Sequence, residues 1–167
     1  MRCAMRLNLK DIIHVPGATL PFSFSVDLSN EEFFGERPIT EPLEVSGVVR
    51  NMADALVLNA EAVTNLSLHC DRCAKPFRRV KQVSYETLLA TELEDEEDSD
   101  IELLEGDELD AGGLMATAFI LDMDTKNLCA PDCKGLCPGC GADLNEEPCR
   151  CQREVDPRLA KLAELLK

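Results

Sequence analysis

The 167-residue chain has 32 acidic and 17 basic residues, a net charge of −15 and a hydrophobic fraction of 45%. This length and apolar fraction suit one domain with a real core, and a second independent domain is not expected. The longest apolar run, at 114–121, is far shorter than the ~18 residues of a membrane span, and no secretory signal follows the basic start. We therefore expect a cytoplasmic protein without membrane attachment, in which thiols are kept reduced.

Alternating apolar residues predict a β-rich region over 1–91. In its first strand, Phe22, Phe24 and Val26 alternate with small or polar residues, as in a strand with one buried face. The predicted strands cover 20–28, 43–49, 55–70 and 77–90. Their short connections favour an antiparallel sheet or a partly closed barrel over a parallel sheet with crossover helices. Residues 29–36 resemble a short helical turn.

The next region, 92–122, combines an acidic segment with a predicted amphipathic helix. Residues 92–110 contain twelve acids and no base, and outside them acids and bases are nearly balanced. Leu114, Ala118 and Leu121 follow at i, i+4 and i+7, which is the spacing of an apolar helical stripe.

A second helix is predicted at the end of the last region, 123–167. Asp156 suits the N-cap position and Pro157 the first turn. The apolar residues that share one face of this helix are Leu159, Leu162, Ala163 and Leu166. These elements together predict an α+β fold, in which the antiparallel sheet carries a cysteine-rich module and the carboxyl-terminal helix as one integrated domain.

Eight of the nine cysteines stand in closely spaced pairs, and Cys3 is set aside. Two of the pairs are C-x-x-C, a spacing that brings two thiolates to one metal from a single tight turn. The four pairs are Cys70 with Cys73, Cys129 with Cys133, Cys137 with Cys140, and Cys149 with Cys151. Soft thiolates in a reduced compartment favour structural zinc, and with every ligand position filled no open catalytic site remains.

The spacing allows one or two zinc ions and leaves the grouping of the thiols open. Two sets of four would be Cys70, Cys73, Cys129 and Cys133, and Cys137, Cys140, Cys149 and Cys151. A single ribbon-like site from Cys70, Cys73, Cys137 and Cys140 is equally allowed. Iron in a rubredoxin-like knuckle, a thioredoxin-like redox pair and a disulfide framework are weaker alternatives. His69 lies opposite Cys70 in the strand period and is not expected to be a ligand.

Basic side chains gather near the predicted metal turns. Held in place by a metal, they could meet RNA phosphates while an aromatic ring stacks on a base. The residues predicted to contact RNA are Arg72, Lys75, Phe77, Arg78, Arg79, Lys81, Lys134, Arg150 and Arg153. The competing interpretation is that these charges pair with the acidic segment. We find no Ser, His and Asp grouping and no phosphate loop, so we expect neither an enzyme nor a small-molecule substrate.

The order of these motifs resembles the YceD family of bacterial and plastid proteins. The resemblance comprises "CDRCAKPF", an acidic stretch, an apolar helix, "LCAPDCKGLCPGCGADLN", a late "CRC" and "DPRLAKL". The resemblance implies that the eight paired cysteines match positions that recur in the family, and that Lys134, Gly135 and Gly141 shape the turns. One departure is that "LDMDTKNLC" lacks the proline that commonly precedes Cys129 in the family.

The resemblance implies a role in the accumulation or maturation of large-subunit (23S) ribosomal RNA. On that basis we expect a non-enzymatic factor whose partner is this RNA or a pre-ribosomal particle, with one or two structural zinc ions holding a basic surface against it. The alternative is a zinc-stabilised protein–protein adaptor that uses the acidic segment to engage a basic ribosomal protein.

Overall fold

The computed structural model describes residues 5–53, 55–91 and 101–151. These residues belong to two compact units, and each is described by itself. The first unit joins the chain up to Leu68 with Phe77–Thr125, and the second joins His69–Pro76 with 126–151. The helix predicted after Asp156 and the part of the acidic segment at 92–100 lie outside the described residues.

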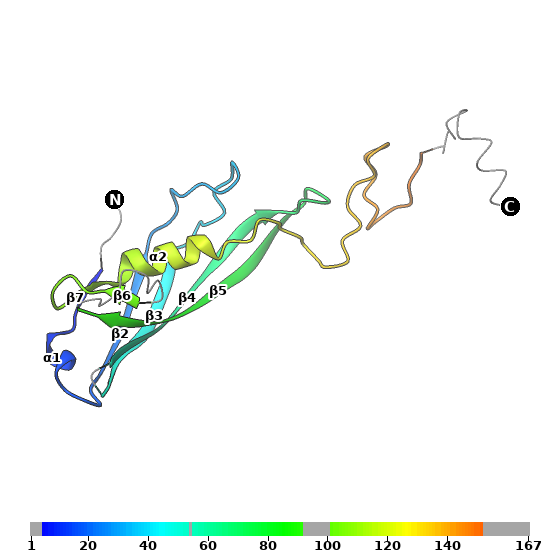
Figure 1. Ribbon diagram of the computed structural model, residues 1–167. Coiled ribbons are helices and arrows are strands. Elements are labelled where there is room, and N and C mark those ends of the chain that lie inside the picture. Colours follow the sequence, from blue (N-terminus) through cyan, green and yellow to red (C-terminus); the bar gives the residue numbers. More distant parts are fainter. Residues whose placement is uncertain (1–4, 54, 92–100, 152–167) are drawn as a thin grey trace, which may run out of the picture. The chain divides into compact units, whose positions relative to one another are not determined.

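A curled five-stranded sheet forms most of the first unit (Figure 1). Its strands, in their order across the sheet, are β2 (Thr19–Val26), β3 (Leu43–Met52), β4 (Ala55–His69), β5 (Pro76–Ala90) and β6 (Ile101–Leu103). The four predicted strands are therefore confirmed. The prediction of an antiparallel sheet is only partly right, because β6 runs parallel to β5, with Leu88 opposite Ile101. The described fold is mostly β rather than α+β.

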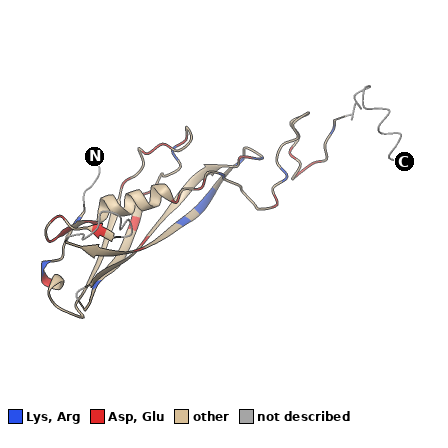
Figure 2. Ribbon diagram, in the orientation of Figure 1, with Lys and Arg blue, Asp and Glu red and all other residues tan. Residues whose placement is uncertain are grey.

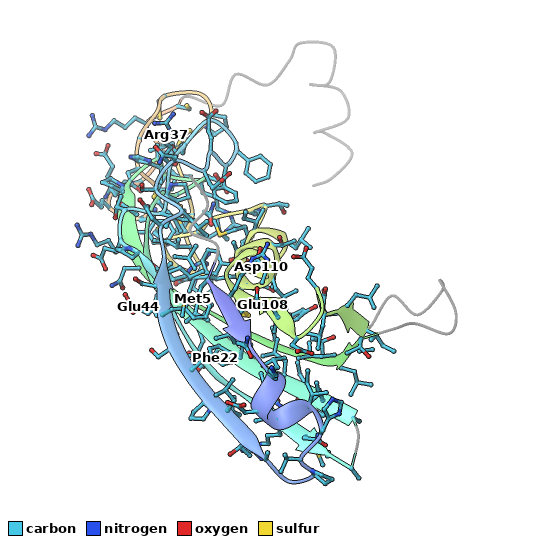
Figure 3. The ribbon with its side chains drawn as sticks, turned by 90° about the vertical axis from the view of Figure 1, so that its left-hand side faces the viewer. Met5, Phe22, Arg37, Glu44, Glu108 and Asp110 are labelled. Atoms are coloured by element: carbon cyan, nitrogen blue, oxygen red, sulfur yellow. The ribbon has the colours of Figure 1, made fainter. Side chains whose placement is uncertain are left out.

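A small second sheet lies beside a short helix in the same unit. Strands β1 (Arg6–Asn8) and β7 (Glu108–Asp110) pair antiparallel, with Arg6 opposite Asp110 and Asn8 opposite Glu108; Figure 3 labels both acidic residues. Helix α1 (Lys10–Ile13) follows β1 and was not predicted. The buried Asn51 amide donates hydrogen bonds to the carbonyl oxygens of Ile12 and Ile13, at 2.8 and 2.7 Å, which ties α1 to the end of β3.

Alternation along the strands places one face of the sheet in the core. Every second residue of β4 from Leu56 to Leu68 is buried, as its period predicts. On β5 the adjacent residues Val80 and Lys81 point to opposite faces of the sheet. Val80 is 62% exposed, whereas the Lys81 side chain is only 14% exposed, so the lysine stem points inward.

Helix α2 (Ala111–Leu121) lies over the sheet (Figure 1). The Asp110 side chain caps it by accepting a hydrogen bond from the Gly113 amide at 3.0 Å. The predicted helix is confirmed, but the predicted stripe through Leu121 is wrong: Leu121 is 80% exposed, and the buried residues include Met115 and Phe119. The helix is apolar on all sides, so periodicity could not select its buried face.

The segment 27–42 between β2 and β3 contains no helix. The expected helical turn at 29–36 is wrong, because Phe33 and Glu36 form an antiparallel bridge around a tight turn. No helix within the described residues is long and apolar enough to cross a membrane.

Candidate metal centres

The eight paired cysteines form two groups of four in the second unit. The first cysteine cluster is Cys70, Cys73, Cys129 and Cys133, and the second is Cys137, Cys140, Cys149 and Cys151. Within each cluster all Sγ atoms lie within 4.8 Å of one another, and all eight thiols are free. This is one of the two groupings that the spacing left open. The described residues do not form the ribbon-like grouping, and His69 belongs to neither cluster.

Two C-x-x-C turns with the same backbone hydrogen bonds build the clusters. In the first, the Ala74 amide donates to the carbonyl oxygen of Cys70 at 2.8 Å, and the Cys70 amide donates to that of Lys75 at 3.0 Å. In the second, Gly141 donates to Cys137 at 2.8 Å, and Cys137 donates to Ala142 at 2.8 Å. The residue after the second cysteine has a positive φ in both turns, 56° at Ala74 and 73° at Gly141. The two C-x-x-C turns therefore share one backbone conformation.

Sequence reasoning missed Ala74. The signal was available, because aligning "CDRCAK" with "CPGCGA" places Ala74 where the second turn has Gly141. Glycine is the usual residue where φ is positive.

Backbone amides acidify one thiol in each cluster. The Cys129 amide is the main cause that lowers the pKa of the Cys70 thiol to about 6. In the second cluster, the amides of Ala142 and then Arg150 lower the pKa of Cys140 to about 6. An N–H donor favours the charged sulfur over the neutral thiol. Each cluster thus presents a thiolate, the form that binds metals, close to neutral pH.

Crowding has the opposite effect on other thiols of the same clusters. The neighbouring Cys70 sulfur is the main cause that raises the pKa of Cys129 to about 12. The Cys149 sulfur does the same for Cys151, whose pKa also rises to about 12. Adjacent negative charges disfavour further ionisation. A divalent cation among the four sulfurs would offset this repulsion, so each cluster favours a bound cation.

The sulfur–sulfur distances fit zinc. A Zn–S bond of ~2.3 Å in a tetrahedral site gives sulfur–sulfur edges of about 3.8 Å. In the first cluster the pairs Cys70–Cys133 and Cys73–Cys129 are 3.8 and 3.6 Å apart. In the second the pairs Cys137–Cys149, Cys137–Cys151 and Cys140–Cys149 are 3.3, 3.7 and 3.9 Å apart. These separations are also far longer than the ~2.05 Å of a disulfide.

The two clusters differ in burial. Cys70, Cys73 and Cys133 are each less than 5% exposed. In the second cluster Cys140 and both cysteines of the C-x-C pair are exposed. Water and competing chelators therefore reach the second cluster more easily than the first.

Side chains around the first C-x-x-C turn connect the two clusters inside the second unit. Arg72 donates from Nη1 to the carbonyl oxygen of Cys133 at 2.7 Å. The Asn145 side-chain amide donates to the Cys133 sulfur at 3.5 Å and to Asp143 at 2.7 Å. The Lys75 ammonium lies 2.7 Å from Asp143 Oδ2. Asp143 and Asn145 were not predicted, and no spacing rule marks them, because they act through the fold of the 135–145 turn.

Most basic residues predicted to contact RNA already have partners. In the second unit, Lys75 pairs with Asp143 and Glu146, and Arg150 pairs with Glu147. The pairing holds Lys75 in its charged form, because the Asp143 carboxylate raises its pKa. Lys134 is exposed. Arg153 lies outside the described residues.

In the first unit the predicted residues form a short basic stretch on β5 (Figure 2). Arg79 pairs with Asp124 at 2.7 Å, and Lys81 pairs with Asp122 at 2.6 Å, which joins β5 to the chain after α2. These acids are not part of the acidic segment that the competing interpretation named. Arg78 is exposed, and Phe77 packs partly buried against the core.

Comparisons with known proteins place residues 58–166 under the family model described as large ribosomal RNA subunit accumulation protein YceD. Uncharacterized proteins from Mycobacterium bovis and Mycobacterium tuberculosis are 31% identical over 123 residues, covering 71% of this chain and 59% of theirs. An uncharacterized protein from Mycobacterium leprae is 29% identical over 134 residues, covering 77% of this chain and 59% of its own. The chain thus spans about three fifths of the length of these curated relatives. No solved structure matches it.

Proposed function

The chain belongs to the YceD family of large ribosomal RNA subunit accumulation proteins, and from that premise we propose that it is a non-enzymatic, cytoplasmic factor that assists accumulation or maturation of 23S ribosomal RNA. The observation that carries this proposal is the family match over 58–166, which includes both cysteine clusters. The factor acts by binding a component of the large subunit during its assembly.

The cysteine clusters support a structural role for zinc in this function. The eight cysteines would hold two ions, and zinc would supply crosslinks between segments that are far apart in the sequence. The first cluster ties the 70–73 turn to 129–133, and the second closes the loop from 137 to 151. With four thiols available for each ion, no ligand position is left for a substrate.

The test of the proposed function is the ratio of 23S to 16S RNA in cells that lack the gene. We expect this ratio to fall on deletion and to be restored by the wild-type chain, but not by Cys70→Ser, which removes a buried ligand. Cys3→Ser is the matched control, because Cys3 belongs to neither predicted thiol set. An unchanged ratio in the deletion strain contradicts the proposed function.

Arg78 and Lys134 are the best-placed residues for direct RNA contact, because both are exposed and neither is in an ion pair among the described residues. Reversing their charge should lower crosslinking to 23S RNA and weaken its salt dependence. Arg79→Glu is a less specific probe, because it also breaks the contact with Asp124.

The adaptor alternative is favoured by the ion pairs that already occupy Lys75, Arg79 and Lys81. An adaptor would use the acidic segment 92–110 to engage a basic ribosomal protein. The adaptor alternative is supported if charge reversal at Arg78 and Arg79 leaves RNA crosslinking intact, while removal of 92–110 abolishes capture of such a protein.

A further inference from the structure

Residues 33–36 form a tight hairpin turn that presents one aromatic ring to solvent. The Phe33 amide donates to the carbonyl oxygen of Glu36 at 2.8 Å, and the Glu36 amide donates back to Phe33 at 3.0 Å. The two residues at the tip have positive φ, 53° at Phe34 and 85° at Gly35. This combination matches a type I′ turn, in which Asn-Gly or Asp-Gly is usual.

Phe34 is unfavourable at this position in two ways. A bulky side chain with positive φ is strained, and the ring is 78% exposed. The preceding Phe33 is partly buried and packed against the core. Phe33 therefore anchors the turn, whereas the Phe34 ring projects without contributing to the packing of its own unit. Strain of this kind is found at binding and functional sites.

The charges around the turn indicate the chemistry of its partner. Glu31, Glu32 and Glu36 stand within three residues of Phe34, and Arg37 follows on the same loop (Figure 3). Three carboxylates against one guanidinium would repel a phosphate backbone. An exposed aromatic ring surrounded by acids instead complements an apolar pocket with a basic rim.

We propose that the 31–37 turn is a docking element for a basic protein, whose apolar pocket receives the Phe34 ring and whose lysines or arginines meet the carboxylates of Glu31 and Glu32. This inference rests on the proposed function, because the partner is sought among the basic proteins of the large ribosomal subunit. It adds a contact surface in the first unit, made of residues that belong neither to the acidic segment nor to the cysteine clusters.

The first test is site-specific photocrosslinking with the full-length, zinc-loaded chain. A benzophenone amino acid replaces Phe34 in one variant and Val15, another exposed apolar turn residue (52% exposed), in the control. Each is irradiated with the protein fraction that concentrated salt strips from large subunits, and separately with protein-free 23S RNA. We expect position 34 to label one or a few lysine- and arginine-rich peptides at least tenfold more strongly than position 15. Labelling of the RNA instead, of a second copy of this chain, or of both positions equally overturns the inference.

The second test separates binding from folding. Phe34→Asn removes the ring but suits the positive φ, so its melting temperature should equal or exceed that of the wild type. Its affinity for the crosslinked protein, once that protein is purified, should fall at least tenfold, and Glu32→Lys should also weaken binding. Phe34→Tyr, which keeps the ring, should restore most of the affinity. Wild-type affinity in Phe34→Asn contradicts the docking role.

The two proposals fail in different ways. If the wild-type chain neither cosediments with large-subunit particles nor affects the ratio of 23S to 16S RNA, the proposed function is wrong. If the wild type does both and Phe34→Asn does both equally well, the function stands and the docking element is wrong.

Discussion

Ala74 and Gly141 occupy the same place in two turns with the same hydrogen bonds, but only one of them is glycine. A left-handed conformation costs an L-residue about 1–2 kcal/mol. Glycine avoids this cost, but its more flexible unfolded chain lowers the free energy of unfolding by about 0.4–1 kcal/mol relative to alanine. We therefore expect Ala74→Gly to raise the free energy of unfolding of the zinc-loaded protein by up to about 1 kcal/mol. Denaturant titration at constant zinc measures it.

Gly141→Ala is the reciprocal variant, and its effect should have the opposite sign. No atom lies within 4 Å of a Cβ built at Gly141, so only backbone strain acts there. A loss of about 1 kcal/mol is expected. Equal effects of the same sign at both positions would show that the two turns are not equivalent.

Gly139 is constrained by space rather than by φ. A Cβ at this position would lie 2.6 Å from the Cys151 sulfur, and a sulfur bound to a metal could not move away. We expect Gly139→Ala to lower the zinc content from two ions to one, as measured by native mass spectrometry. Pro138→Ala, the exposed neighbour, should keep two ions. Two tightly bound zinc ions in Gly139→Ala would contradict the assigned role of Cys151.

Gly47, like Gly139, is constrained by the space around it, because it lies inside β3 between two partner strands. A Cβ at Gly47 would be 2.4 Å from the Asn59 carbonyl oxygen on β4 and 2.6 Å from the Phe22 ring on β2. Phe22 is labelled in Figure 3. Alanine would gain about 0.5–1 kcal/mol of backbone entropy, but overpacking costs about 1–3 kcal/mol. The clash is with backbone on one side, so Gly47→Ala should lower the free energy of unfolding of the sheet.

Urea titration of Gly47→Ala against Ser46→Ala checks this expectation. Ser46 is the adjacent residue and is exposed, so its substitution should change little. If Gly47→Ala leaves the free energy of unfolding unchanged or raises it, the neighbouring strands can move apart at this position without loss of stability, and the expectation is wrong.

The ion pair between Lys75 and Asp143 gives the second unit a pH dependence. The Lys75 ammonium is the main cause that lowers the pKa of Asp143. A carboxyl group with a lowered pKa contributes stability above its unfolded pKa of ~3.9, and this contribution is lost as the pH falls through the folded value. We therefore expect Asp143→Asn to be less stable than wild type by a constant amount between pH 5 and 8.

Below about pH 4 the difference between Asp143→Asn and wild type should shrink, because the wild-type carboxyl group is then also neutral. Urea titrations at several pH values measure it. A difference that changes between pH 6 and 8 would point to a thiol as the titrating group instead.

The sheet was predictable from the sequence where one face is buried, and less so elsewhere. Period-2 alternation located β2, β3, β4 and β5 because half of each strand packs in the core. Strand β6 was missed because it is three residues long and follows a run of acids. The buried face of α2 could not be read because every side of the helix is apolar.

The candidate metal site was also predictable from the sequence only in part. Cysteine spacing identified the eight thiols but not their grouping, because grouping depends on contacts such as those of Arg72 and Asn145 that have no spacing signal. The exposed ring of Phe34 was hidden for another reason. "EEFFGE" reads as a short helix until the positive φ values at Phe34 and Gly35 are known.

At the scale of the whole molecule, we expect the two units to depend on metal to different degrees. Among the described residues, the buried core of the first unit, which includes Leu58, Met115 and Phe119, contains no cysteine. The described part of the second unit has no strand or helix beyond the ends of β4 and β5, so we expect its fold to depend on metal bound at the two clusters. Chelation should therefore unfold the second unit and leave the sheet intact.

Stepwise removal of zinc tests this expectation. The second cluster, with three exposed cysteines, should lose its ion to a moderate excess of chelator before the first cluster, in which only Cys129 is exposed, because the chelator reaches it more directly. Native mass spectrometry counts the ions, while circular dichroism and the fluorescence of Tyr85, the single tyrosine of the chain, report on the sheet. We expect both sheet signals to persist in the metal-free protein, as amide exchange becomes rapid between Lys126 and Cys151. Collapse of the Tyr85 signal with loss of the first ion would instead mean that the first unit also needs the metal to fold.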